Sequence, residues 1–217
     1  RIGTDPTGKS VEVSVRSQWI TAAVSPPNSS PYNLPNNVTI RGLTFHHSVG
    51  GHGVGGIEPG PWRTNICTSQ PNPDDCQLNT GTGWVIENND IGWAHGPGFH
   101  FQSSLHKVQN NTIHHNTPTG IDGEAKSASI ASNTIHDNNN EGFSVFFHAG
   151  GVKITLSNLT TVNNNTVYDN TGVGLWCDVL CSDVTLANNR VYRNTMSGIM
   201  YEISTKATIK DNVVFDN

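Results

Sequence analysis

The chain has 217 residues, a formal net charge of −5 and only 13% charged residues. This length suffices for one domain with a sizeable core, and the lack of a Lys/Arg cluster argues against nucleic acid as a partner. No apolar run approaches about 18 residues, which argues against a membrane-spanning helix, while abundant Asn and Gly favour turns and short strands.

The first third of the chain shows only traces of regular structure. Valines alternate with polar residues over 11–15, as in a β-strand, and residues 39–45 form a degenerate copy of a pattern that recurs later. Residues 49–83 are rich in Gly and Pro and contain Cys67 and Cys76. Long loops of repetitive folds usually lie on the functional face, so we expect this insertion to cover one end of a binding groove.

A seven-residue pattern then repeats six times. The copies are residues 85–91, 107–113, 129–135, 161–167, 185–191 and 208–214. Their second and seventh positions are aliphatic, and most copies start about 22 to 24 residues apart, a period typical of stacked coils. The sequence therefore predicts an all-β chain: a right-handed parallel β-helix solenoid of about 22 residues per coil, forming a single domain over 1–217.

Two rows of Asn accompany the repeat. The fifth position of the pattern is Asn89, Asn111, Asn133, Asn165, Asn189 and Asn212, and a second row follows at Asn116, Asn138, Asn170, Asn194 and Asn217. Asn tolerates the left-handed conformation of a bend, and stacked amides can bond to one another, so we expect two internal ladders. Because the pattern runs to the last residue and solenoid ends need caps, we expect a fragment of a longer solenoid, with further coils or a fused domain.

A third strand is expected after a Gly in each coil, at 98–102, 120–124, 142–146, 174–178 and 198–202. The residue after Gly is large and apolar and should point inward, so the second and fourth residues should point outward. The outward rows are His100, Asp122, Ser144, Trp176 and Met200, and Gln102, Glu124, Phe146, Asp178 and Glu202. A second insertion, 147–160, brings His148 towards this face. Carboxylates beside aromatic rings suit a polysaccharide or oligosaccharide.

Asp178 and Glu202 occupy equivalent places on successive coils. Adjacent strands lie about 4.8 Å apart, so the two carboxyls should be roughly 5–6 Å apart, close to the separation of a retaining glycosidase pair. The alternative is that they are ordinary solvated acids.

The stretches 174–178 and 198–204 resemble the end of the catalytic region in β-helix glycoside hydrolases, most closely the β-helix β-xylosidases, which carry a Gly-x-Trp-x-Asp strand and a Glu strand one coil later. The resemblance implies that Asp178 is the nucleophile and Glu202 the acid/base. The chain departs from that family after Glu202, where it has Ser204–Ala207 instead of a His-Gly-Pro-like segment.

The leading hypothesis is a secreted carbohydrate-active protein, a retaining glycoside hydrolase acting on plant-type polysaccharide or its oligosaccharides. The expected sugar-binding residues are His100, Gln102, Asp122, Glu124, Lys126, Phe146, His148 and Trp176. One alternative is a non-catalytic carbohydrate-binding module, for example xylan-binding, attached to an enzyme. Less favoured are a structural surface fragment and a polysaccharide lyase, in which Lys126 beside Glu124 and Asp122 would form the site.

The four Cys fall into two local pairs, Cys67 with Cys76 and Cys177 with Cys181, which we interpret as disulfides of a secreted protein. For Cys177 a buried thiol is the alternative, since it is expected to point inward.

No metal or cofactor is expected. His114 and His136 share a row with Tyr168 and Tyr192, and for this row a ladder of stacked rings is favoured over a metal site.

Overall fold

The computed structural model describes residues 15–22, 34–51, 54–60 and 81–217. Within these ranges every regular element is a β-strand, and no helix that could cross a membrane occurs among them. Cys67, Cys76 and most of the insertion 49–83 lie outside the described residues, as does the alternating segment 11–14.

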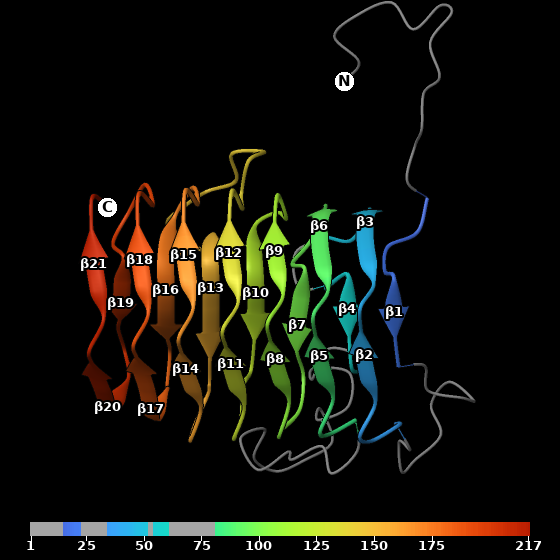
Figure 1. Cartoon of the computed structure of the whole chain (residues 1–217), viewed down its shortest axis with the longest axis horizontal. Coiled ribbons are helices and arrows are strands. Elements are labelled where there is room, and N and C mark those ends of the chain that lie inside the picture. Colours follow the sequence, from blue (N-terminus) through green and yellow to red (C-terminus); the bar gives the residue numbers. More distant parts are fainter. Residues whose placement is uncertain (1–14, 23–33, 52–53, 61–80) are drawn as a thin grey trace, which may run out of the picture.

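The strands form three parallel sheets that run along one axis (Figure 1). Sheet A consists of β1 (Ile20–Thr21), β4 (Ile57–Glu58), β7 (Phe99–Phe101), β10 (Thr119–Gly123), β13 (Gly150–Thr155), β16 (Val173–Asp178) and β19 (Ile199–Tyr201). Sheet B consists of β2 (Thr39–Arg41), β5 (Val85–Glu87), β8 (Lys107–Gln109), β11 (Ser129–Ala131), β14 (Thr161–Asn163), β17 (Ser182–Ala187) and β20 (Thr205–Lys210). Sheet C consists of β3 (Thr44–Ser48), β6 (Asp90–Ala94), β9 (Thr112–His114), β12 (Thr134–His136), β15 (Thr166–Tyr168), β18 (Arg190–Tyr192) and β21 (Val213–Phe215). Each coil contributes one strand to each sheet, which confirms the right-handed parallel β-helix.

The core consists of aliphatic stacks. The second position of the pattern fills the inner face of sheet B with Ile86, Val108, Ile130, Val162 and Leu186, and the seventh fills that of sheet C with Ile91, Ile113, Ile135, Val167 and Val191. All of these side chains are buried, because alternate residues of a strand point to the same side. The repeat therefore gave the inward positions correctly.

Both Asn ladders are present. The side-chain and backbone nitrogens of Asn111 donate to Oδ1 of Asn133 (both 3.0 Å), and Nδ2 also donates to the Ile86 carbonyl at 2.9 Å. The same bonds recur from coil to coil as far as Asn212, and the second ladder continues to Asn217. Each Asn side chain thus forms hydrogen bonds with buried polar groups of neighbouring coils, which would otherwise lack a partner.

One strand of sheet A lies elsewhere than expected. In the coil that the second insertion lengthens, the third strand is β13, in which Lys153 pairs in register with Asp122 and Trp176. Lys153 and Thr155 therefore take the places that the sequence assigned to Ser144 and Phe146. The extra residues form the loop 139–149, instead of the insertion expected at 147–160.

Packing at the stacked glycines explains the difference. A Cβ at Gly151 would lie 2.7 Å from the Gly174 carbonyl oxygen, whereas one at Gly142 would meet nothing within 4 Å. Of Gly142 and Gly151, only Gly151 therefore stands at the crowded position of the stacked glycines, because close backbone approach excludes a side chain there.

Cys177 and Cys181 are both buried free thiols, in contrast to the expected disulfide. Cys177 points inward from β16, as the alternative interpretation held, and Cys181 Sγ donates to the Ile154 carbonyl at 3.5 Å. The inward direction of Cys177 follows from strand alternation, since Trp176 beside it points outward.

Candidate functional site

The outer face of sheet A carries a row of polar and aromatic side chains that interact with one another. His100, Asp122, Lys153 and Trp176 stand side by side on paired strands. The loop 139–149, which projects between β12 and β13 (Figure 1), folds over this row: His148 contacts Asp122, and the Phe147 carbonyl accepts a hydrogen bond from Lys153.

Asp122 is the centre of a buried cluster. Its Oδ1 contacts Nδ1 of His100 and its Oδ2 contacts Nε2 of His148. Burial by itself raises the pKa of Asp122, but the two histidines outweigh it and hold this pKa below its usual range. Burial lowers the pKa of His100, and the Asp122 carboxylate outweighs that effect and raises it. The pair therefore favours the charged forms of both groups.

Glu58 extends the cluster by one coil. It is almost fully buried at the end of β4 and accepts hydrogen bonds from Gln18 and, at 3.4 Å, from Nε2 of Gln102. Burial raises the pKa of Glu58 to about 7. One face thus combines a carboxyl that is half-protonated near neutral pH with an ionised carboxylate, a contrast found at acid–base sites.

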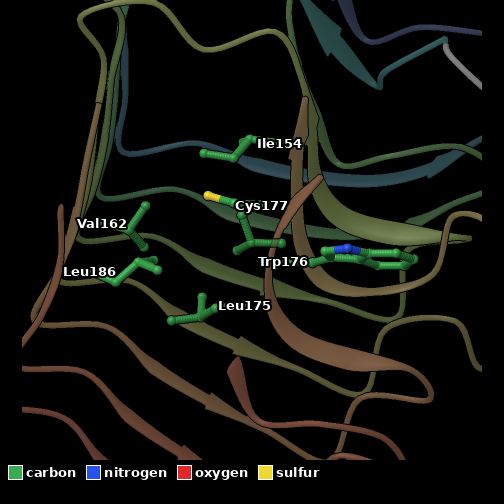
Figure 2. A pocket seen from close by; sticks show the side chains of 7 residues that line it. Ile154, Val162, Leu175, Trp176, Cys177 and Leu186 are labelled. Carbon is green, nitrogen blue, oxygen red and sulfur yellow. The ribbon is translucent and has the colours of Figure 1, made fainter. Parts of the chain in front are cut away.

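A second group lies further along the same face. Lys153 Nζ is 2.9 Å from Oδ2 of Asp178 and 3.6 Å from the centroid of the Trp176 ring. The indole of Trp176 donates to Oε1 of Glu202 at 3.0 Å. Figure 2 shows Trp176 on the outer side of its strand, opposite Leu175 and Cys177.

The two acids are therefore held on the outer face by an ammonium and an indole. The other oxygen of Asp178, Oδ1, is buried and has no hydrogen-bond partner among the described residues. A buried acceptor without a partner is rare and requires an explanation, such as a bound ligand or a catalytic role.

Comparison with known proteins agrees with this architecture. A family model described as "Right handed beta helix region" matches residues 77–217. The chain belongs to the right-handed β-helix family.

Two solved structures are similar to this β-helix, a single and a double mutant of the periplasmic alginate epimerase AlgG. They are 11% and 13% identical to it, with TM-scores of 0.51 and 0.52. Each match covers 83% of this chain and 46% of the epimerase, so the chain spans about half the length of these structures. At this identity the likeness shows the fold alone. No curated protein matches the chain.

The β-helix brings together most of the residues expected at the groove. His100, Asp122 and His148 form one group with Gln102 nearby, and Trp176, Asp178 and Glu202 form the other.

The remaining expected residues make no hydrogen bond or ion pair described here with these two groups, although Glu124 is close enough to His100 to help raise the pKa of that imidazole. Phe146 is 83% exposed in the loop 139–149. Lys126 bridges Ser104 and Asn158 beyond the end of β10, and Glu124 lies half-buried just before it.

Glu58 and Lys153 were missed by sequence reasoning. Both follow the order Gly, inward apolar residue, outward residue that marks the other strands of sheet A, in Gly56-Ile57-Glu58 and Gly151-Val152-Lys153. That order could have identified both residues. Each of the two segments, however, lies beside an insertion that interrupts the period of the repeat.

The raised pKa of Glu58 predicts a pH-dependent stability. The pKa of Glu58 is about 7 in the folded protein, against an ordinary value of 4.5 in the unfolded chain, so the folded protein binds the proton more tightly. This difference stabilises the fold fully below pH 4.5, and the stabilisation is lost as the pH rises through 7. The loss corresponds to roughly 3 kcal/mol. Urea unfolding at pH 4.5 and pH 8 should show a smaller difference for Glu58→Gln than for the wild type. The control Asp211→Asn, which replaces an exposed acid near the C-terminal end of the described chain, should behave as the wild type. Equal differences for the wild type and Glu58→Gln would contradict the assignment.

Proposed function

We propose that this β-helix is a secreted carbohydrate-active enzyme, a retaining glycoside hydrolase that acts on a neutral polysaccharide or its oligosaccharides at the outer face of sheet A. The observation that carries the proposal is the pair of acids at the end of β16 and directly after β19. Asp178 has one oxygen bound by Lys153 and the other buried without a partner among the described residues, and Glu202 lies on the next coil.

These environments suit two different roles. Lys153 fixes Oδ2 of Asp178, so Oδ1 is the atom that attacks the anomeric carbon while the bond from that carbon to the leaving oxygen breaks. Glu202, positioned by the Trp176 indole, gives its proton to the leaving oxygen. Water then attacks the glycosyl–enzyme ester, Glu202 takes the proton of the water, and Asp178 is released as a carboxylate.

Access to Asp178 requires movement of the loop 139–149. The backbone carbonyl of Phe147 in this loop accepts a hydrogen bond from Lys153 Nζ, and the Phe147 ring centroid lies 5.7 Å from the same atom, so the loop covers the ion pair. The loop also exposes Phe143 and Phe146 to solvent. Opening would uncover Asp178 and offer aromatic faces to a sugar ring.

The charge of the face favours a neutral substrate. Glu124, Asp178 and Glu202 are partly exposed on this side, and Lys153 is buried in its ion pair with Asp178. A negative surface repels a polyuronate, whereas the hydroxyls of a neutral chain can donate to carboxylates.

A second candidate is proton abstraction from a uronate, as in a lyase or an epimerase. It is favoured by the cluster of His100, Asp122 and His148, in which a buried carboxylate orients two imidazoles, and by the likeness in fold to an alginate epimerase. It is weaker because Asp122 and His100 are covered, and because Asp122, which the lyase interpretation places beside Lys126, bonds instead to the histidines.

Product analysis separates these functions. The protein should be incubated with neutral polysaccharides and with polyuronates, and new reducing ends, unsaturated sugars and uronate stereochemistry should be measured. We expect reducing ends from a neutral polysaccharide without unsaturated sugar. Unsaturated or epimerised uronates would favour the second candidate, and binding without any product would favour a carbohydrate-binding module.

A further inference from the structure

The outer face of sheet C carries a second cluster, on three neighbouring strands near the N-terminal end of the β-helix. His46 on β3 and His114 on β9 both turn towards Asp90 on β6, the strand between them. Nε2 of His46 is 3.2 Å from Oδ2 of Asp90, and Nε2 of His114 is 2.8 Å from Oδ1. The three ligand atoms all lie within 4.8 Å of one another.

A missing side chain makes this convergence possible. Gly92 pairs in register with both His46 and His114, so it occupies the place between them in the outward row. A Cβ on Gly92 would lie 2.7 Å from Cε1 and 3.0 Å from Nε2 of the His114 imidazole. The ring therefore fills the space that any other residue would occupy, and this space is what allows it to reach Asp90.

Ring stacking does not account for this arrangement. His114 and His136 are stacked at 5.3 Å, and the stack continues through Tyr168, Tyr192 and Phe215, as expected for the row. Stacking requires parallel rings along the axis, but it does not require two histidines to face one carboxylate.

We propose that His46, Asp90 and His114 bind a divalent transition-metal ion, for which Zn²⁺ is the best fit. Two imidazole nitrogens and a carboxylate oxygen are ligands that zinc takes in proteins, at about 2.0–2.2 Å. Bonds of that length in a tetrahedron place neighbouring ligand atoms about 3.3 Å apart, and the two nitrogen–oxygen distances to Asp90 are 3.2 and 2.8 Å. Three protein ligands leave one position for water or a ligand oxygen.

The surroundings hold the ligands in place. Trp93 packs edge-on against both imidazoles, with centroid distances of 4.5 Å to His46 and 4.6 Å to His114. Nδ1 of His114 lies 2.8 Å from Nδ1 of His115, so a proton can sit between these atoms. With that proton on His114 Nδ1, its Nε2 offers a lone pair to the metal, an outer contact of the kind that zinc-bound histidines make.

The test is a titration of chelator-treated protein with Zn²⁺ by calorimetry and with Co²⁺ by visible absorption. We expect one ion bound by the wild type, with tetrahedral-type Co²⁺ absorption. Asp90→Asn and His46→Gln should each weaken binding by about 10-fold or more. His136→Gln, in the same row but outside the cluster, should bind as the wild type.

Gly92→Ala provides a control that keeps all three ligands. Its Cβ should displace the His114 ring, so binding should weaken while the far-ultraviolet circular dichroism stays that of the wild type. Because the chain has other histidines that could bind the ion, the variants decide where the ion binds. Wild-type protein that binds no Zn²⁺, or binding that Asp90→Asn, His46→Gln and Gly92→Ala all leave unchanged, would overturn the proposal.

Discussion

Replacing Asp178 by Ala is expected to lower the rate of glycoside hydrolysis by on the order of 10³-fold or more, because the variant lacks the carboxylate that forms the covalent intermediate. Binding of oligosaccharide should change little, since the other groups of the face remain. The hydrolysis rate is measured as the initial rate on a polysaccharide that the wild type cleaves. Binding is measured by calorimetry with oligosaccharides of the same polysaccharide. A loss of binding with an unchanged turnover number would contradict the role given to Asp178.

The ion pair with Lys153 requires a second variant. Lys153 is almost fully buried, and removing its partner leaves an uncompensated charge that destabilises the fold. Asp178→Asn keeps the shape and a hydrogen-bond acceptor, and it should also lack activity. Asp183→Ala, which removes an exposed acid of sheet B, should hydrolyse at the wild-type rate. An active Asp178→Asn protein would assign the nucleophile elsewhere.

Asn133→Ala should lower the free energy of unfolding by about 3 kcal/mol, since buried groups left without a partner cost about 1–3 kcal/mol each. Oδ1 of Asn133 accepts from the backbone nitrogen and from Nδ2 of Asn111, and its Nδ2 donates to the Val108 carbonyl and to Asn165. Ala supplies none of these bonds. Thermal unfolding should therefore shift down by roughly 6–12 °C.

Asn163→Ala is the matched control. Asn163 lies on the same coil of the solenoid as Asn165 but points outward from β14, where it is half-exposed. Its replacement should change the melting temperature by no more than a degree or two. Equal shifts for Asn133→Ala and Asn163→Ala would show that the internal ladder contributes no special stability.

Periodicity explains what could be predicted from the sequence. The Asn rows and the aliphatic positions recur at fixed places in each coil, and the alternation of strand residues then gives the outward positions of Asp122, Trp176 and Asp178. In the coil that contains the second insertion, the pattern predicted the strand after Gly142, whereas the strand follows Gly151. Only the contact of Gly151 with Gly174 and its neighbours decides between them, and that contact is not visible in the pattern.

Contacts made by loops and by tilted rings could not be predicted in the same way. His148 was expected near the outer face of sheet A, but its contact with Asp122 was not predicted. This contact depends on the path of a loop that does not follow the repeat. His46 and His114 lie in a row that the repeat defines, and the repeat alone indicates stacking. Their approach to Asp90 depends on the space left by Gly92.

The most direct test of glycoside hydrolysis at the sheet A face is covalent trapping. The protein should be treated with a fluorinated glycoside that forms the glycosyl–enzyme ester but releases it slowly, and the modified residue should be located by peptide mass mapping. We expect one glycosyl group per chain, attached to Asp178 in the wild type and absent from Asp178→Asn. Hydrolysis that inverts the anomeric centre without any trapped ester, or a label on another residue, would contradict the account.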